Sequence, residues 1–209
     1  WLDNHRLTAE QQTTDWTLNP LRTAYSSVRS AFMLGFTDMF YYLANDGKQA
    51  VRQNILNALG SITEVNDPDS DLTFSFICHS AGTVIVHDLL FHLFGGSTHQ
   101  YHPETTDQVL APFQQLIREN RLRLHRLITF GSPILPMTVR SHAMMNILLS
   151  GKEKLSLEKI GIKTYTTGEQ AKWLNFWDKD DVIAYPVSFL YDNPDHLLED
   201  RYQDVGDVF

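Results

Sequence analysis

A serine with the surroundings of a nucleophile stands between two apolar segments. Residues 74–90 read FSFICHSAGTVIVHDLL: an apolar run, then Cys-His-Ser-Ala-Gly, then a second apolar run. A serine on a sharp turn between a strand and a helix, followed by small residues that let the two backbones approach, is the sequence form of a nucleophile elbow. Ser80 is therefore the candidate nucleophile, and acyl transfer is the chemistry that such a turn supports.

The same turn directs a backbone N–H toward the reacting group. In an elbow, the N–H after the nucleophile, here that of Ala81, points at the oxygen that becomes negative during acyl transfer. Ala81 is thus predicted to supply half of an oxyanion hole. The pentapeptide has low specificity by itself, because Cys78 replaces the usual first glycine. An ordinary strand-to-helix turn is the competing interpretation, so the flanking segments must decide.

The segments on either side of the serine predict a strand and a helix. Residues 72–77 are rich in β-branched and aromatic side chains and follow a turn-forming Asn-Asp-Pro-Asp-Ser run, which predicts a central buried strand. Residues 84–93 are apolar nearly all round and end at Gly95-Gly96, which predicts a helix packed inside a layer. This order of elements is the one that an elbow needs.

Two further motifs stand downstream of the elbow. Residues 126–130 predict a strand that ends in Gly-Ser-Pro, and residues 173–177 predict another that ends in Asp-Lys-Asp-Asp. The elbow CHSAG and the segments TFGSPI and NFWDKDDVIAYPV together resemble a lipase- or esterase-type α/β hydrolase. The resemblance implies an α/β fold of three layers, in which a mostly parallel sheet carries helices on both faces.

The resemblance also implies an acid. Hydrolases of this kind place serine, acid and histidine in that order along the chain. Ser80 then matches the nucleophile, and an aspartate of the Asp-Lys-Asp-Asp cluster matches the acid. Asp181 fits best because it directly precedes Val-Ile-Ala-Tyr-Pro, as the acid of the family commonly precedes a short apolar run and a proline. Asp178 and Asp180 are the alternatives.

A triad also needs an imidazole to take the proton of the serine hydroxyl. His196 is the only histidine that follows Asp181 in this chain, and it lies in a segment with the character of an acidic surface loop. The histidine of the family usually follows one more strand, which residues 205–209 could begin. The expected base is therefore either His196 or a histidine beyond Phe209.

The remaining reactive side chains are expected to be structural. Cys78 ends the buried strand without a basic neighbour in sequence to lower its pKa, and His79 is expected to point into the packing around the serine. Ser132 is expected in a packing turn, because no strand-to-helix elbow follows it. His87 and His92 lie five residues apart, a spacing that does not place two ligands on one helix face. We predict no metal site and no bound cofactor.

Length and composition favour one domain. The 209 residues, 43% of them hydrophobic, suffice for a sizeable core. No early strand leads into the His-Gly-type loop that usually donates the second oxyanion N–H. We therefore expect residues 1–209 to be a single domain truncated at both ends, without the early strands and the C-terminal end. Helices are expected from Asn19-Pro20, from about Lys48, and over residues 104–120.

A Met- and Leu-rich apolar stretch fills residues 135–168. Its spacing is helical, and two interpretations stay open: ordinary packing, or a lid-like insertion that covers the active site.

Charge and cysteine content narrow the partners. A net charge of −8 with no basic cluster argues against nucleic acid or an anionic membrane surface as the main partner. No apolar run approaches the roughly 18 residues of a membrane span. The single cysteine excludes an internal disulfide and leaves the compartment open, with a lean toward the cytoplasm.

The expected function is that of a serine hydrolase. It would cleave carboxylic esters, lipid esters among the candidates, through an acyl-enzyme on Ser80, so the expected partner is a small-molecule or lipid ester. A thioesterase or acyltransferase would use the same site. The alternative of another class is a non-catalytic interaction module built on the same scaffold, and the sequence does not indicate an oligomeric state.

Overall fold

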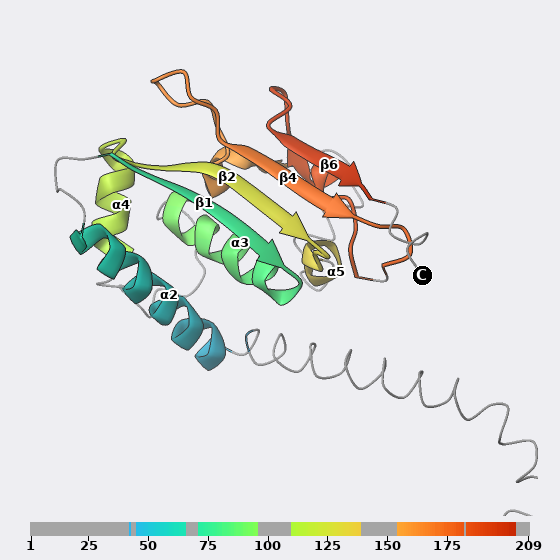
Figure 1. Cartoon of the computed structure of the whole chain (residues 1–209), viewed down its shortest axis with the longest axis horizontal. Helices are drawn as coiled ribbons and strands as arrows, with labels where there is room; N and C mark the ends of the chain where they lie inside the picture. The colour runs from blue at the N-terminus through green and yellow to red at the C-terminus, as the bar shows by residue number, and fades with distance from the viewer. Residues whose placement is uncertain are drawn as a thin grey trace, which may run out of the picture.

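A parallel sheet forms the centre of the structure, a computed structural model that describes residues 42, 45–65, 71–95, 110–138, 154–181 and 183–203 (Figure 1). The sheet has four strands in the order β1-β2-β4-β6, and all neighbours are parallel. The strands are β1 (Leu72–His79), β2 (Leu122–Phe130), β4 (Lys172–Trp177) and β6 (Leu198–Tyr202). A small parallel sheet pairs β3 (Leu155–Ser156) with β5 (Tyr191–Asp192). The predicted α/β class with a mostly parallel sheet is confirmed.

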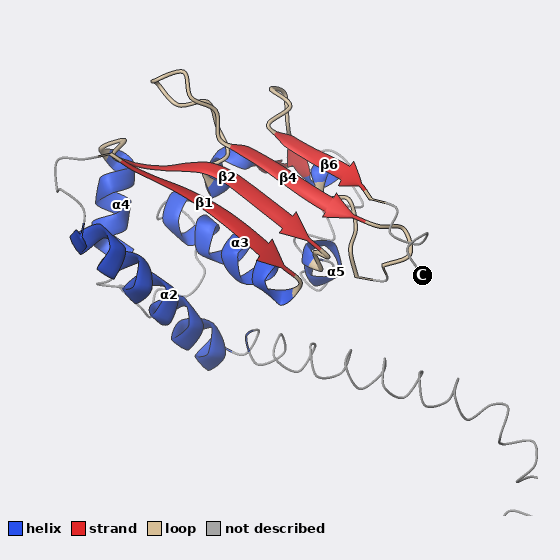
Figure 2. Cartoon of the chain, viewed as in Figure 1, coloured by secondary structure: helices blue, strands red, loops and turns tan. Residues whose placement is uncertain are grey.

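Helices pack against this sheet (Figure 2). Helix α3 (Ala81–Phe94) follows β1 and packs on it, and α4 (Leu110–Arg118) packs on β2 and α3. Helix α2 (Asn45–Val65) is tied to α3 through Asp88, which accepts hydrogen bonds from the Tyr42 hydroxyl at 2.7 Å and from Arg52 at 3.0 Å. The short helices are α5 (Ile134–Thr138), η1 (Leu157–Ile160) and η2 (Ser188–Leu190).

Two of the three expected helices fall within the described residues. The helix predicted from about Lys48 corresponds to α2. Helix α4 is the described part of the helix predicted over residues 104–120. The helix predicted from Asn19-Pro20 lies outside the described residues.

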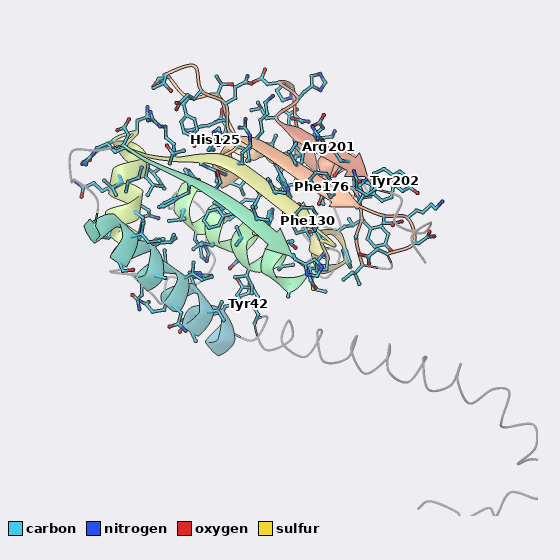
Figure 3. The ribbon with its side chains drawn as sticks, in the orientation of Figure 1. Tyr42, His125, Phe130, Phe176, Arg201 and Tyr202 are labelled. Carbon is cyan, nitrogen blue, oxygen red and sulfur yellow. The ribbon has the colours of Figure 1, made fainter. Side chains whose placement is uncertain are left out.

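The two faces of the sheet differ. Along β1 the residues alternate, with Phe74 and Phe76 packed against the helices and Ile77 75% exposed on the opposite side. On that opposite side Phe130 and Phe176 stack with their ring centres 4.9 Å apart (Figure 3). Helices were expected on both faces. Within the described ranges they cover one face only, so the sequence-based expectation is met for that face alone.

Two apolar clusters fill the space between the sheet and the helices. The larger contains Trp173, which has no exposed surface, together with Leu127 of β2 and Leu90 of α3. The smaller joins Leu56 of α2 to Leu89 of α3. Each fully buried side chain of this kind contributes about 1.5–3 kcal/mol. The two clusters fix α3, and with it the turn that precedes its first residue, against the sheet.

Residues 154–168 pack into this core. Leu157 and Ile160 of η1 are buried in the larger cluster. After η1, Gly161 has φ +78°, and a Cβ at this position would lie 2.8 Å from the ring of Phe94 on α3. The rest of the segment, residues 139–153, lies outside the described residues, and the lid-like insertion stays a prediction there.

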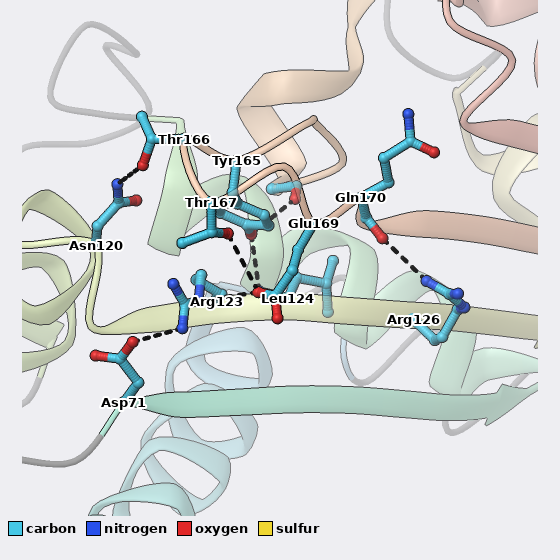
Figure 4. Close-up of polar contacts among 11 residues, drawn as sticks. Asp71, Asn120, Arg123, Leu124, Arg126, Tyr165, Thr166, Thr167, Glu169 and Gln170 are labelled. Carbon is cyan, nitrogen blue, oxygen red and sulfur yellow. Dashed lines mark hydrogen bonds and ion pairs between the residues drawn. The ribbon is translucent and has the colours of Figure 1, made fainter.

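Polar contacts fasten the amino-terminal end of β2 (Figure 4). The buried Tyr165 hydroxyl accepts a hydrogen bond from the Leu124 N–H at 2.8 Å and donates one to the Gly161 carbonyl at 3.2 Å. Arg123 forms an ion pair with Asp71, which precedes β1. The first two strands are therefore tied together at the end that lies opposite Ser80.

None of the helices in the described part of the chain has the length and apolar character needed to cross a membrane.

Candidate active site

Three loops meet at the carboxyl-terminal edge of the sheet. Ser80 follows β1, Gly131 follows β2, and residues 178–181 follow β4. Because the three strands are parallel and adjacent, their carboxyl ends lie at one edge, as the arrowheads show in Figure 1. This edge is the usual ligand-binding edge of an open α/β sheet.

Ser80 has a strained backbone conformation. Its φ is 52° and its ψ is −128°, between the end of β1 and the first residue of α3. These angles match the first central position of a type II′ turn, where glycine is normally required. A non-glycine residue held in such a region costs of order 1–3 kcal/mol and persists only where the surroundings enforce it. The Ser80 N–H donates to the Phe130 carbonyl at 3.0 Å, which extends the β1–β2 pairing into the turn.

Thr83 of α3 restrains the Ser80 carbonyl and is itself held by Ser132. The Ser80 carbonyl accepts the Thr83 N–H at 3.0 Å and the Thr83 hydroxyl at 2.7 Å. The Thr83 hydroxyl accepts a hydrogen bond from the Ser132 hydroxyl at 2.9 Å, and Ser132 belongs to the turn after β2. Both side chains are buried, with 0% and 1% exposure. Ser132 therefore supports the turn of Ser80.

Ala81 is the first residue of α3. The first N–H groups of a helix have no acceptor within the helix, and they form the positive end of the helix dipole. Ala81 directly follows Ser80 in this first turn, and its role as an oxyanion donor stays a prediction.

The acidic loop after β4 presents Asp181 toward the other two loops. Its Oδ1 accepts the Ile183 N–H at 3.0 Å. Its Oδ2 would lie 3.5 Å from a Cβ placed on Gly131. Asp178, by contrast, is buried, and its Oδ1 accepts the Asp180 N–H at 3.0 Å within the loop. Asp178 shapes the loop, whereas Asp181 faces the turn after β2.

His79 lies beside the same glycine. Its Nε2 would lie 3.4 Å from a Cβ placed on Gly131, so the imidazole and the Asp181 carboxylate approach this glycine together. Gly131 has φ +54°, a conformation that L side chains rarely adopt, so glycine is favoured here by its backbone rather than by lack of space. His79 was expected to point into the packing around the serine. It is exposed instead, because successive strand residues alternate between faces and this one falls on the open face.

His196 is at the other edge of the sheet. The strand register places Leu198 of β6 level with Phe76 of β1. His196 precedes Leu198 by two residues and Ser80 follows Phe76 by four. Phe76 to His79 of β1 alone span about 10 Å at about 3.3 Å per residue, so Ser80 and His196 lie beyond opposite ends of the strands. The structure does not bring His196 to Ser80, and the sequence-based expectation of a triad with His196 conflicts with this placement.

The last described strand was not predicted. It is β6, at Leu198–Tyr202, which pairs with β4, while the strand expected to begin at residues 205–209 lies outside the described residues. After β6, the Gln203 N–H donates to the Trp177 carbonyl at 2.9 Å. The chain therefore reaches the edge of Ser80 and Asp181 at Gln203, while residues 204–209 lie outside the described residues.

A buried polar network behind the acidic loop was not foreseen. The Trp173 indole N–H donates to the Thr129 hydroxyl at 2.9 Å, which donates to Asn175 Oδ1 at 2.8 Å. The Asn175 amide donates to Asp200 at 2.7 Å, and Asp200 accepts the Val187 N–H at 3.0 Å. The network ties the segment that follows the acidic loop to β6. The available signal was a Thr and an Asn that each stand between two apolar residues near the end of a strand.

Cys78 and His87 have shifted pKa values because they are buried. Burial raises the pKa of the Cys78 thiol to about 11, so the thiol is protonated at neutral pH and is a poor nucleophile. Burial lowers the pKa of His87 to about 4, against the opposing charge of Asp88. The His87 ring contacts the Tyr191 hydroxyl inside the core. Both residues are structural, as the sequence indicated.

Comparison with known proteins assigns no relative: no family model, no curated protein and no solved structure matches the chain. Within the described ranges, no group of three or more His, Cys, Asp or Glu side chains is arranged to hold a metal ion.

Proposed function

We propose that this protein is a serine hydrolase that cleaves carboxylic esters through an acyl-enzyme on Ser80. The observation that carries the proposal is the Ser80 backbone, held at φ 52° and ψ −128° between a parallel strand and a helix. Strain of this kind is kept where it exposes a nucleophile at the top of a sheet. The approach of Asp181 to the neighbouring turn supports the same assignment.

In the proposed reaction, Ser80 Oγ attacks the carbonyl carbon of the ester and its proton passes to a base. The Ala81 N–H stabilises the negative oxygen of the tetrahedral intermediate. The base returns the proton to the leaving alcohol as its C–O bond breaks. Water then attacks the acyl-enzyme and gives a proton to the base. The carboxylic acid product is released as that proton returns to Ser80.

The base has two sources. His79 is the histidine that the described residues place at this edge, and the carboxylate of Asp181 would orient it across Gly131. The other source is a histidine beyond Phe209, since the chain leaves β6 at the same edge. Asp181 serves as the acid in either case.

One observation favours a second candidate, the non-catalytic interaction module. His196, one of the two expected sources of the base, lies before the amino-terminal end of β6, away from Ser80. A scaffold that had lost its base would keep the strained turn and the acidic loop without turnover. A thioesterase or an acyltransferase would use Ser80 in the same way with a different leaving group or acceptor.

Labelling of the full-length protein with a fluorophosphonate probe tests the proposal. The probe modifies activated serines, and peptide mass spectrometry identifies the residue. We expect labelling at Ser80 that is lost in Ser80→Ala and kept in Cys78→Ala. Loss of labelling in His79→Ala would identify His79 as the base, and retained labelling would assign the base to a histidine beyond Phe209. A folded protein that does not label is not a serine hydrolase, and the interaction module becomes the better assignment.

A further inference from the structure

The strained turn at Ser80 is held mainly through the Ser80 carbonyl. This oxygen accepts two hydrogen bonds, both from Thr83: the N–H at 3.0 Å and the side-chain hydroxyl at 2.7 Å. The Thr83 side chain has no exposed surface, so water does not compete for its hydroxyl. The orientation of the peptide after Ser80, which carries the Ala81 N–H, depends on this carbonyl because the two groups belong to one planar unit.

The direction of the hydrogen bonds is set by the number of protons. A hydroxyl has one proton to donate and lone pairs to accept with. Since the Thr83 proton goes to the Ser80 carbonyl, Thr83 Oγ1 must be the acceptor for the Ser132 hydroxyl at 2.9 Å. Ser132 Oγ in turn accepts the Ile134 N–H at 3.4 Å. The chain of donors therefore runs in one direction, from the backbone of α5 to the backbone of the candidate nucleophile.

We propose that Ser132 is a positioning residue for Ser80, acting through the Thr83 hydroxyl. The inference rests on the proposed function, because it assigns what holds the nucleophile and the Ala81 N–H in the reactive geometry. Ser132 lies in the turn after β2, so the serine loop is fastened from the neighbouring strand as well as from its own helix. The hydroxyl of Ser132 is buried and occupied in this bond, which also explains why it is not itself a nucleophile.

A purely structural role is the competing explanation. Two buried hydroxyls that satisfy one another stabilise the fold wherever they occur. A matched control is available at the amino-terminal end of β2, where the buried Tyr165 hydroxyl also accepts one hydrogen bond and donates one (Figure 4). Tyr165→Phe removes this hydroxyl and leaves the contacts of Ser80, Thr83 and Ser132 in place.

The variants are Ser132→Ala, Thr83→Val, Thr83→Ser and Tyr165→Phe in the full-length protein. Thr83→Val removes the hydroxyl and keeps the shape, whereas Thr83→Ser keeps the hydroxyl. Two quantities are measured: the second-order rate of fluorophosphonate labelling at Ser80, and the hydrogen-exchange rate of the Thr83 amide, whose acceptor is the Ser80 carbonyl. The stability of each variant is measured in parallel so that exchange is compared at equal global stability.

We expect Ser132→Ala and Thr83→Val to slow labelling by about tenfold, the upper range for one lost neutral hydrogen bond. The Thr83 amide should exchange faster in Ser132→Ala than in Tyr165→Phe at equal stability. Thr83→Ser should restore most of the labelling rate, and Tyr165→Phe should label like the unmodified protein.

Two results separate the inference from the proposed function. If the unmodified protein labels and Ser132→Ala labels equally fast with an unchanged Thr83 amide, the positioning role is wrong and the hydrolase assignment stands. If the unmodified protein does not label but Ser132→Ala still loosens the Thr83 amide, the hydrolase assignment fails. The restraint on the Ser80 turn is then real and serves another purpose.

Discussion

Replacing Ser80 by glycine should stabilise the fold while it abolishes the proposed chemistry. Ser80 has φ 52° and ψ −128°, which glycine adopts without steric cost. Relief of the strain is worth about 1–3 kcal/mol. Glycine also gives the unfolded chain more freedom, which costs about 0.5–1 kcal/mol. The net gain should be about 1 kcal/mol.

Ser80→Ala is the matched control for this prediction. It removes the hydroxyl as the glycine variant does, but it keeps the Cβ and therefore the strain. The two variants differ in backbone freedom and in one methyl group, so the difference between their free energies of unfolding reports the strain less the entropic cost of glycine, about 0.5–1 kcal/mol. A gain of about 1 kcal/mol corresponds to a rise in melting temperature of about 2–4 °C for a domain of this size.

The assay is chemical denaturation followed by far-UV circular dichroism. The slope of the free energy of unfolding against denaturant concentration should be the same in both variants, so that a shift in midpoint reports stability. Ser80→Gly should unfold at higher denaturant concentration than Ser80→Ala, and neither should react with the fluorophosphonate probe. If Ser80→Gly is less stable than Ser80→Ala by the full entropic cost of glycine, about 0.5–1 kcal/mol, the turn carries no strain. The structural argument for Ser80 as a nucleophile is then removed, and the assignment depends on the labelling result alone.

Two further predictions concern stability. Gly161→Ala should destabilise the fold by about 2 kcal/mol, because the new Cβ adds strain at φ +78° and would lie 2.8 Å from the Phe94 ring. Chemical denaturation should detect this loss of stability. An unchanged free energy of unfolding would show that η1 can move away from α3. Lowering the pH from about 6.5 to about 4 should cost up to about 3 kcal/mol through His87, whose pKa in the folded protein is about 4. In that window the unfolded chain binds a proton that the folded chain does not, so stability falls as pH falls. The difference in free energy of unfolding between the unmodified protein and His87→Asn should show this slope when it is measured against pH, and it should be flat above pH about 7. A difference that does not vary with pH would contradict the buried neutral imidazole.

The local elements could be predicted from the sequence because their signals are local. The apolar run before Ser80 and the apolar run after it predicted β1 and α3, which the structure contains. The strands at residues 126–130 and 173–177 lie within β2 and β4. In each case the periodicity of a short segment determines whether it forms a strand or a helix.

Strand β6 could not be recognised in the same way. Its sequence, Leu-Glu-Asp-Arg-Tyr, has three consecutive charged residues, and its place beside β4 is set by tertiary pairing. Charged residues are common on strands at the edge of a sheet, where they are half solvated. The position of His196 could not be predicted for the same reason, since chain order alone does not reveal at which end of the strands a loop residue lies.

Buried polar residues in the strands and directly after them carry information that sequence reasoning left unused. A buried polar group needs a partner, so a hydroxyl or an amide among apolar residues predicts a hydrogen bond to a neighbouring element. Ser132, in the turn after β2, donates to Thr83 of α3, and Asn175 of β4 donates to Asp200 of β6. The serine loop after β1 is thus held from the turn after β2, and the segment behind the acidic loop is held from β6. Each side of the candidate site is fastened by the strand next to it, so the two sides can be perturbed separately. Substitution at Ser132 should act on the nucleophile, whereas substitution at Asn175 should act on the segment behind Asp181.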